Sequence, residues 1–231
     1  MKSLLDRHSL GSTLDSLSES LFFEENIPAA QRTAAAKWIA RRQGLPGAYA
    51  GMFAPTERDA RGIRLFTGEP VRSRVGIAHQ LGEESCRILT ALRMKDRIVQ
   101  AALRRAVEGM AARLAEAGRS GFDTGVYCCG TCSAGYWRNL ALHLFPRAEE
   151  RLRNGLRQLK QLRRGDGTWR RFPFYYTSLA LTEIGPELAR AEMQYAAARW
   201  RRILPRLAAA EDSIARRRAA VGRRLLEQCA T

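Results

Sequence analysis

Three cysteines lie within five residues of one another, in the run Cys128-Cys129-Gly130-Thr131-Cys132. Cys129 and Cys132 have the C-x-x-C spacing that proteins use both for zinc binding and for dithiol redox exchange. A cysteine near the start of a helix is also a favoured nucleophile, because exposed backbone amides stabilise its thiolate. The cluster therefore predicts a metal site or a reactive thiol. A third interpretation stays open, in which these are small buried side chains between closely packed helices.

A zinc site at this cluster needs a fourth ligand. Beyond the cysteine run, the sequence offers Asp123, His79 and Cys86, and the spacing selects none of them. His143 cannot share a zinc ion with Cys132 on one continuous helix, because His143 is eleven positions further along the chain, or ~16 Å along the axis. Zinc is thus a possible cofactor, with three predicted metal ligands: Cys128, Cys129 and Cys132.

Two other cysteine mechanisms are disfavoured. The run resembles the cysteine-protease sequence Cys-Gly-Ser-Cys-Trp-Ala, but no histidine follows His143 to act as the base. Thioredoxin-like exchange requires the C-x-x-C motif at a junction between a strand and a helix, and no strand pattern precedes the run.

A second group of residues suits an anionic ligand. Arg170 and Arg171 follow Trp169 and precede Tyr175 and Tyr176, at the expected start of a helix. Two arginines flanked by aromatic rings would suit a diphosphate or carboxylate head with an apolar tail. The alternative is a loop with solvated arginines whose aromatic rings pack in the core. With one tyrosine from an earlier loop, the predicted ligand-binding residues are Tyr127, Trp169, Arg170, Arg171, Tyr175 and Tyr176.

The chain of 231 residues carries a net charge of +16, with 45% hydrophobic and 27% charged residues. This composition is globular, and the charge attracts nucleic acid, anionic membrane surfaces or phosphorylated ligands. Arginine supplies most of the charge and is spread over many segments, so solvated helix faces explain it equally well. No run approaches the ~20 apolar residues of a membrane span. Without a signal-peptide core, and with an odd number of cysteines, the sequence predicts a cytoplasmic protein with reduced thiols. His8 is expected in a frayed terminus.

Apolar residues recur at helical spacing almost everywhere, which predicts an all-α fold. We expect one helical domain over 1–231, with no composition change dividing it. The predicted helices cover residues 14–23, 28–42, 56–68, a long region 73–117, 131–144, 147–163 and 174–184. The C-terminal helices occupy about 186–230, and the first of them should break or kink at Pro205.

Loops with the pattern glycine-x-aromatic recur three times between these helices. They contain Gly47 with Tyr49, Gly125 with Tyr127, and Gly167 with Trp169. The second and third glycines are 42 residues apart, the length of one helical-hairpin repeat, and the first and second are 78 apart. Glycine allows the positive φ at a helix end, and the aromatic ring attaches the loop to the next layer.

The first of these loops also has Gln43 four residues before its glycine, and Arg163 holds this position in the third. The pattern resembles the Q-x-x-x-G-x-W repeat of the terpenoid cyclase and protein prenyltransferase superfamily, over residues 37–184. The resemblance implies stacked helical hairpins that form a complete or partial α/α toroid. It also implies inner helices after each loop, and an apolar or anionic ligand in the concave centre. A partial ring could be completed in a homo-oligomer.

The family's chemistry is matched only in part. The aspartate-rich acid and magnesium motifs of the cyclases are absent. The protein prenyltransferases hold zinc with an aspartate, a cysteine and a histidine, and Asp123, the cysteine cluster and His143 supply those types in order. Asp123 is therefore the candidate catalytic residue. Three functions stay open: an atypical toroid protein that binds a ligand, a metal-dependent prenyl-transfer or cyclase-type enzyme, and a basic helical module that binds nucleic acid.

Overall fold

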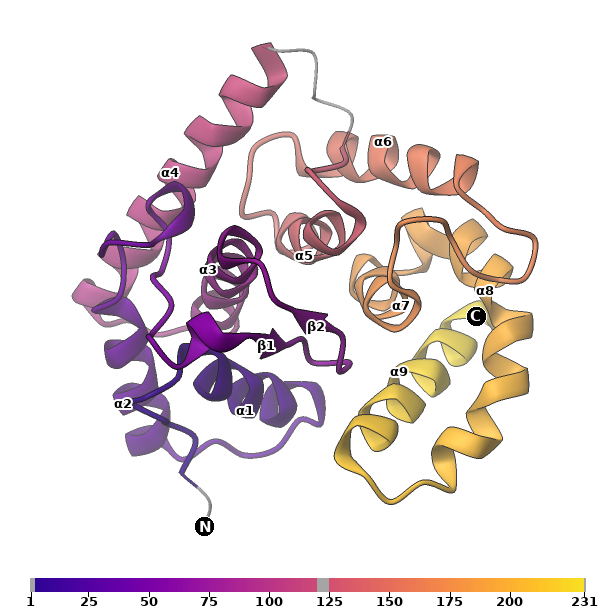
Figure 1. Cartoon of the computed structure of the whole chain (residues 1–231), viewed down its shortest axis with the longest axis horizontal. Coiled ribbons are helices and arrows are strands. Elements are labelled where there is room, and N and C mark those ends of the chain that lie inside the picture. Colours follow the sequence, from indigo (N-terminus) through magenta and orange to yellow (C-terminus); the bar gives the residue numbers. More distant parts are fainter. Residues whose placement is uncertain (1–2, 120–124, 231) are drawn as a thin grey trace. The chain divides into compact units, whose positions relative to one another are not determined.

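The computed structural model describes residues 3–119 and 125–230, and the regular secondary structure there is almost entirely helical (Figure 1). The described part holds nine α-helices, two short 3-10 turns and one antiparallel pair of two-residue strands. The all-α prediction is confirmed. No helix in this part is both long and apolar enough to cross a membrane. The chain divides into two compact units, which are described separately below.

Unit 1 comprises Met1–Leu65 and Pro70–Gly118. Helix α3 packs against α1 and against both 3-10 turns, η1 and η2. The core of unit 1 includes Leu14, Ile39, Phe53, Ile88 and Met110, all with at most 1% of their surface exposed. The elements are α1 (Leu10–Phe22), α2 (Ala29–Ala40), η1 (Tyr49–Gly51), η2 (Asp59–Arg61), β1 (Ile63–Arg64), β2 (Pro70–Val71), α3 (Arg74–Ala91) and α4 (Arg97–Arg119).

Unit 2 comprises Phe66–Glu69 and Arg119–Thr231, and its helices form two layers (Figure 1). In one layer α7 packs between α5 and α9, and in the other α6 packs against α8. The layers meet where α5 contacts α6 and where α8 contacts both α7 and α9. Trp137 and Trp200 are the largest fully buried side chains. The helices are α5 (Gly130–Leu140), α6 (Ala148–Gln161), α7 (Phe174–Ile184), α8 (Pro186–Ala208) and α9 (Ser213–Ala230).

The prediction of a helix over 56–68 is wrong. This segment forms η2 and then β1, the first strand of the hairpin, with Ile63 paired to Val71. Gly62 and Gly68 both have positive φ, at 125° and 91°, and interrupt any helix there. The Asp59 carboxylate, which a continuous helix would leave on its surface, is instead buried and bound by the N-terminus of α1.

Two other helix boundaries differ from the prediction. The region 73–117 is two helices, separated at Arg93, whose φ is 49°, and at Asp96, whose carboxylate accepts the first amides of α4. Conversely, the helix does not break at Pro205, because α8 continues to Ala208, and a kink there stays a prediction. Pro205 lies in the last turn of α8, where its missing N–H removes only one of the final hydrogen bonds.

The glycine–aromatic loops all contact the second helix that follows them. In the first loop the Gln43 side-chain oxygen accepts a hydrogen bond from Arg105 of α4 (2.6 Å). In the third, Arg163 donates to Glu192 of α8 (2.7 Å). Each of these side chains lies beside a short antiparallel bridge within its loop: Gln43 with Phe53, and Arg163 with Trp169.

The second loop approaches α6 through its backbone. A Cβ at Gly125 would lie 2.1 Å from the Arg151 carbonyl oxygen, so only glycine fits here. Each of the three loops therefore contacts the second helix after it, through a side chain in the first and third loops and through the backbone in the second. Closure of these helices into a ring, and the single-domain assignment, stay predictions.

Gly109→Ala is expected to lower the free energy of unfolding of unit 1 by about 1–3 kcal/mol, because it overpacks a closed contact. A Cβ at Gly109 on α4 would lie 2.1 Å from the Ala50 carbonyl oxygen of η1. Ala50 already has a φ of 51° and has little freedom to move. Urea unfolding measures the change. Glu108→Ala, at an exposed neighbouring position, is the control, and equal effects of the two substitutions would contradict the prediction.

Candidate functional site

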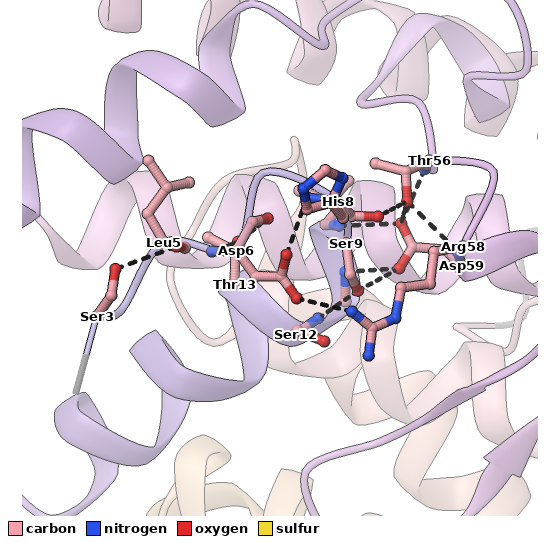
Figure 2. Close-up of polar contacts among 12 residues, drawn as sticks. Ser3, Leu5, Asp6, His8, Ser9, Ser12, Thr13, Thr56, Arg58 and Asp59 are labelled. Carbon is pink, nitrogen blue, oxygen red and sulfur yellow. Dashed lines mark hydrogen bonds and ion pairs between the residues drawn. The ribbon is translucent and has the colours of Figure 1, made fainter.

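A buried carboxylate organises the N-terminal side of unit 1 (Figure 2). Asp59 in η2 is 2% exposed, and it accepts hydrogen bonds from the backbone amides of Leu10 (3.0 Å) and Gly11 (3.1 Å) in the first turn of α1. The Ser9 hydroxyl, which caps α1, donates to the same carboxylate at 2.6 Å. A negative charge suits this position because the amides of a helix N-terminus carry partial positive charge.

Asp59 also fixes the loop before η2. The Thr56 amide donates to its carboxylate at 2.8 Å. The Thr56 hydroxyl lies 2.8 Å from the same carboxylate and 2.7 Å from the His8 carbonyl oxygen, to which it donates. The segment around His8 is thereby attached to the loop around Thr56, more than forty residues away in sequence. The expectation that His8 lies in a frayed terminus is wrong.

A cleft of about 700 Å³ lies beside this network, within unit 1. Its lining has four arginines and one histidine against a single glutamate. The lining residues are Arg7, His8, Arg42, Pro55, Thr56, Glu57, Arg58 and Arg61. Such a set favours an anion, because a guanidinium group binds phosphate or carboxylate oxygens with two parallel N–H donors.

Arg42 is the most firmly positioned of the four arginines. Its Nε and Nη2 atoms donate to the carbonyl oxygens of Ala54 and Pro55, both at 2.6 Å, and its guanidinium lies 5.4 Å from the centre of the Trp38 ring. Burial lowers the pKa of Arg42 and the Asp59 charge opposes this, but an arginine stays charged at neutral pH. Because this charge has lost part of its hydration, an anion in the cleft would stabilise it.

The remaining arginines of the cleft are exposed. Arg58 lies 3.4 Å from Asp6 with 64% of its side chain exposed, a pair expected to contribute little to stability. Within the described part of the chain, the side chains of Arg7 and Arg61 form no hydrogen bond or ion pair. These two guanidinium groups are therefore available to a ligand without breaking an existing contact.

A smaller hollow in unit 2, about 280 Å³, lies between α6 and α8. It is also basic, but two of its three cationic side chains are engaged locally: Arg153 pairs with Glu149 and Arg157 contacts Asn154. Its one acidic residue, Glu192, accepts hydrogen bonds from Arg163 and from the Trp169 indole. It therefore presents less available positive charge than the cleft of unit 1.

Two of the predicted ligand-binding aromatics, Trp169 and Tyr175, pack against the same ring, that of Phe174. Trp169 and Tyr176 are buried, at 2% and 3% exposure. The Trp169 indole donates to Glu192 of α8 (2.9 Å). The Tyr176 hydroxyl accepts from Arg138 of α5 (3.3 Å). Tyr175 packs its ring against Trp200.

The other predicted ligand-binding residues are more accessible. Arg170 and Arg171 are exposed, and Tyr127 is half-buried, with its ring 6.3 Å from that of Tyr136. Asp123, the candidate catalytic residue, lies outside the described residues. The predicted roles of these side chains in ligand binding and catalysis stay predictions.

The three clustered cysteines surround the start of α5. Cys129 is the N-cap residue, and its sulfur accepts a hydrogen bond from the Cys132 amide at 3.5 Å. Cys128 and Cys129 are exposed and Cys132 is buried. Cys86, one of the possible further zinc ligands, is fully buried on α3, where burial and the nearby Glu83 charge raise the pKa of its thiol. A thiol that keeps its proton is a poor metal ligand.

None of the cleft's arginines was singled out by sequence reasoning. The local sequence signal for the cleft is the concentration of charge in the run Glu57-Arg58-Asp59-Ala60-Arg61. Arg7 and Arg42 are far from this run in sequence, and only folding brings them to the same cleft. Comparison with protein-family models, with curated proteins and with solved structures finds no match. The functional argument therefore rests on the chemistry of the site.

Proposed function

We propose that this protein binds a small phosphate-bearing anion in the cleft of unit 1. The observation that carries the proposal is that Arg7, Arg42, Arg58 and Arg61 line one cleft together with a single glutamate. A volume of about 700 Å³ is in the range of small-ligand sites, roughly 300–1,000 Å³. The net charge of +16 would increase the rate at which an anion reaches the cleft.

The position of Arg42 favours a tightly held anion over a loose counterion. Its guanidinium is fixed by two carbonyl oxygens and the Trp38 ring, so little side-chain entropy is lost when a ligand binds. The exposed Arg7 and Arg61 side chains then bind the ligand without giving up a hydrogen bond or ion pair to another described residue. This combination suits the several oxygens of a phosphate or diphosphate better than a single carboxylate.

Kinship with the terpenoid cyclase and protein prenyltransferase superfamily is part of the proposal. Its support is that each of the three glycine–aromatic loops contacts the second helix after it, together with the two-layer packing of α5 to α9. The resemblance implies an apolar or anionic ligand, and the cleft suits an anion. The toroid, the apolar ligand in its centre, a prenyl-transfer or cyclase-type activity and a homo-oligomer stay proposals that rest on the resemblance alone.

Calorimetric titration with pyrophosphate tests the function. We expect saturable binding, weakened about tenfold or more by Arg7→Ala or Arg61→Ala, because a hydrogen bond to a charged group contributes roughly 1.5–3 kcal/mol. Both side chains are exposed, so the variants should fold normally. Arg104→Ala removes an exposed charge of unit 1 outside the cleft and should change the affinity less than about twofold, because surface charges act weakly at a distance in salt.

Equal losses in all three variants, or no saturable binding by the wild type, would contradict a specific cleft. The same titration with an oligonucleotide tests the nucleic-acid alternative. Equal losses of oligonucleotide affinity in all three variants, together with a steep decrease of this affinity with salt, would favour that alternative, because phosphate neutralisation releases counterions.

A further inference from the structure

Cys128 and Cys132 form a pair of thiols at the start of α5. Their Sγ atoms lie within 4.8 Å of each other, one on an exposed residue and one on a residue that is 4% exposed. The Cys129 sulfur caps the helix instead, because it accepts a hydrogen bond from the Cys132 amide. The structure thus pairs the outer two cysteines of the run, whose spacing is C-x-x-x-C.

The backbone around the pair is held in place. The Ser133 hydroxyl accepts from the Tyr127 amide (2.9 Å) and lies 2.8 Å from the carbonyl oxygens of both Tyr127 and Cys129. Gly130 is packed so closely that a Cβ would lie 2.1 Å from the Arg171 carbonyl oxygen. A loop fixed on both sides presents its thiols in a constant geometry, which lowers the entropic cost of binding an ion.

We propose that Cys128 and Cys132 are two ligands of one soft divalent cation, with zinc as the expected ion. Zinc–sulfur bonds of ~2.3 Å in tetrahedral geometry place two sulfurs about 3.8 Å apart, within reach of the observed pair. On binding, each thiol loses its proton to solvent and forms a bond from sulfur to the metal, so one zinc ion releases two protons. The amides at the start of α5 stabilise the resulting thiolates.

The exposure of Cys128 leaves the remaining coordination positions accessible to water or to additional ligands. The additional ligands suggested by the sequence stay predictions. This proposal involves none of the atoms of the cleft in unit 1, so it stands or fails independently of phosphate binding.

Zinc binding to the reduced full-length protein, measured by competition with a chromophoric chelator, tests the pair. We expect the wild type and Cys129→Ser to bind one zinc ion with affinities within about threefold, since Cys129 is not a ligand. Cys128→Ser and Cys132→Ser should bind more than about tenfold more weakly, because even the loss of an outer-shell partner typically costs 10–100-fold. Cobalt(II) in place of zinc should give a sulfur-to-metal charge-transfer band that both variants diminish.

Three outcomes would overturn the proposal: no zinc binding by the wild type, unchanged affinity in Cys128→Ser, or an equal loss in Cys129→Ser. Cys132 is buried, so its serine variant could fail through misfolding. Cys128→Ser, at an exposed position, keeps the test decisive, and circular dichroism of each variant verifies the fold.

Discussion

Asp59→Ala is expected to lower the free energy of unfolding of unit 1 by about 3–5 kcal/mol, because each buried donor left without its acceptor costs roughly 1–3 kcal/mol. The Leu10, Gly11 and Thr56 amides and the Ser9 hydroxyl all donate to this one carboxylate. Because the site is buried, water replaces these acceptors poorly. Urea unfolding at neutral pH, followed by far-UV circular dichroism, measures the change.

Two variants frame this result. Asp59→Asn keeps the shape of the side chain and one acceptor oxygen. Its free energy of unfolding should therefore lie between those of the wild type and the alanine variant. Asp6→Ala removes a half-exposed carboxylate of the same region, which pairs with Arg58 and accepts the His8 amide, and its effect should stay below about 1 kcal/mol because both contacts are exposed to solvent. A loss below 1 kcal/mol for Asp59→Ala would show that the network does not hold the segment.

The same variant links the fold of unit 1 to the proposed function. Thr56 attaches the backbone of His8 to the cleft wall, and Asp59 orients Thr56. Without Asp59, Arg7 and His8 lose their fixed position beside Arg61. Under conditions where Asp59→Ala is still folded, its affinity for pyrophosphate should therefore fall, although Asp59 is not expected to touch the ligand.

Trp137→Ala is expected to destabilise unit 2 by about 3–5 kcal/mol, the usual cost of emptying a buried aromatic site. Trp137 of α5 is completely buried and stacks on Phe172, with ring centres 5.3 Å apart. Its indole N–H donates to the Gly125 carbonyl oxygen at 2.7 Å, which ties the second loop to α5. Gly155 of α6 leaves room for the ring, because a Cβ there would lie 2.5 Å from the indole nitrogen.

Trp137→Phe separates the two contributions. It keeps most of the ring packing and leaves the Gly125 carbonyl without its donor, so a loss of about 1–3 kcal/mol is expected. Thermal and urea unfolding of both variants measure these changes. If the phenylalanine variant were as unstable as the alanine variant, the hydrogen bond and not the packing would dominate at this site.

The sequence predicted best those elements whose ends are set by neighbouring residues. Helix α7 was predicted at the observed bounds, Phe174–Ile184, because Pro173 precedes it and Gly185 and Pro186 end it. Proline and glycine act through their own backbone geometry, so their effect is visible without knowledge of the fold. The all-α class follows in the same way from helical periodicity over most of the chain.

The errors occurred where distant residues decide the outcome. Apolar residues in the segment 56–68 have a spacing compatible with a helix. The Asp59 side chain nevertheless binds the N-terminus of α1, almost fifty residues away in sequence. The boundary between the two compact units has no counterpart in the sequence, since no change in composition marks residue 118, and the single-domain assignment stays a prediction. Long-range hydrogen bonds and packing outweigh propensities that differ by less than about 1 kcal/mol per residue.

By itself the sequence determined the fold class, the strong positive charge, the repeated loops and the presence of a cysteine cluster, because each of these is a local or summed property. Only the tertiary structure decided which side chains meet. It brought Arg7, Arg42 and Arg61 to one cleft, and it paired Cys128 with Cys132 while Cys129 became a helix cap. The physical reason is that a site depends on distances between atoms, and folding sets those distances through burial and hydrogen bonds between residues far apart in the chain.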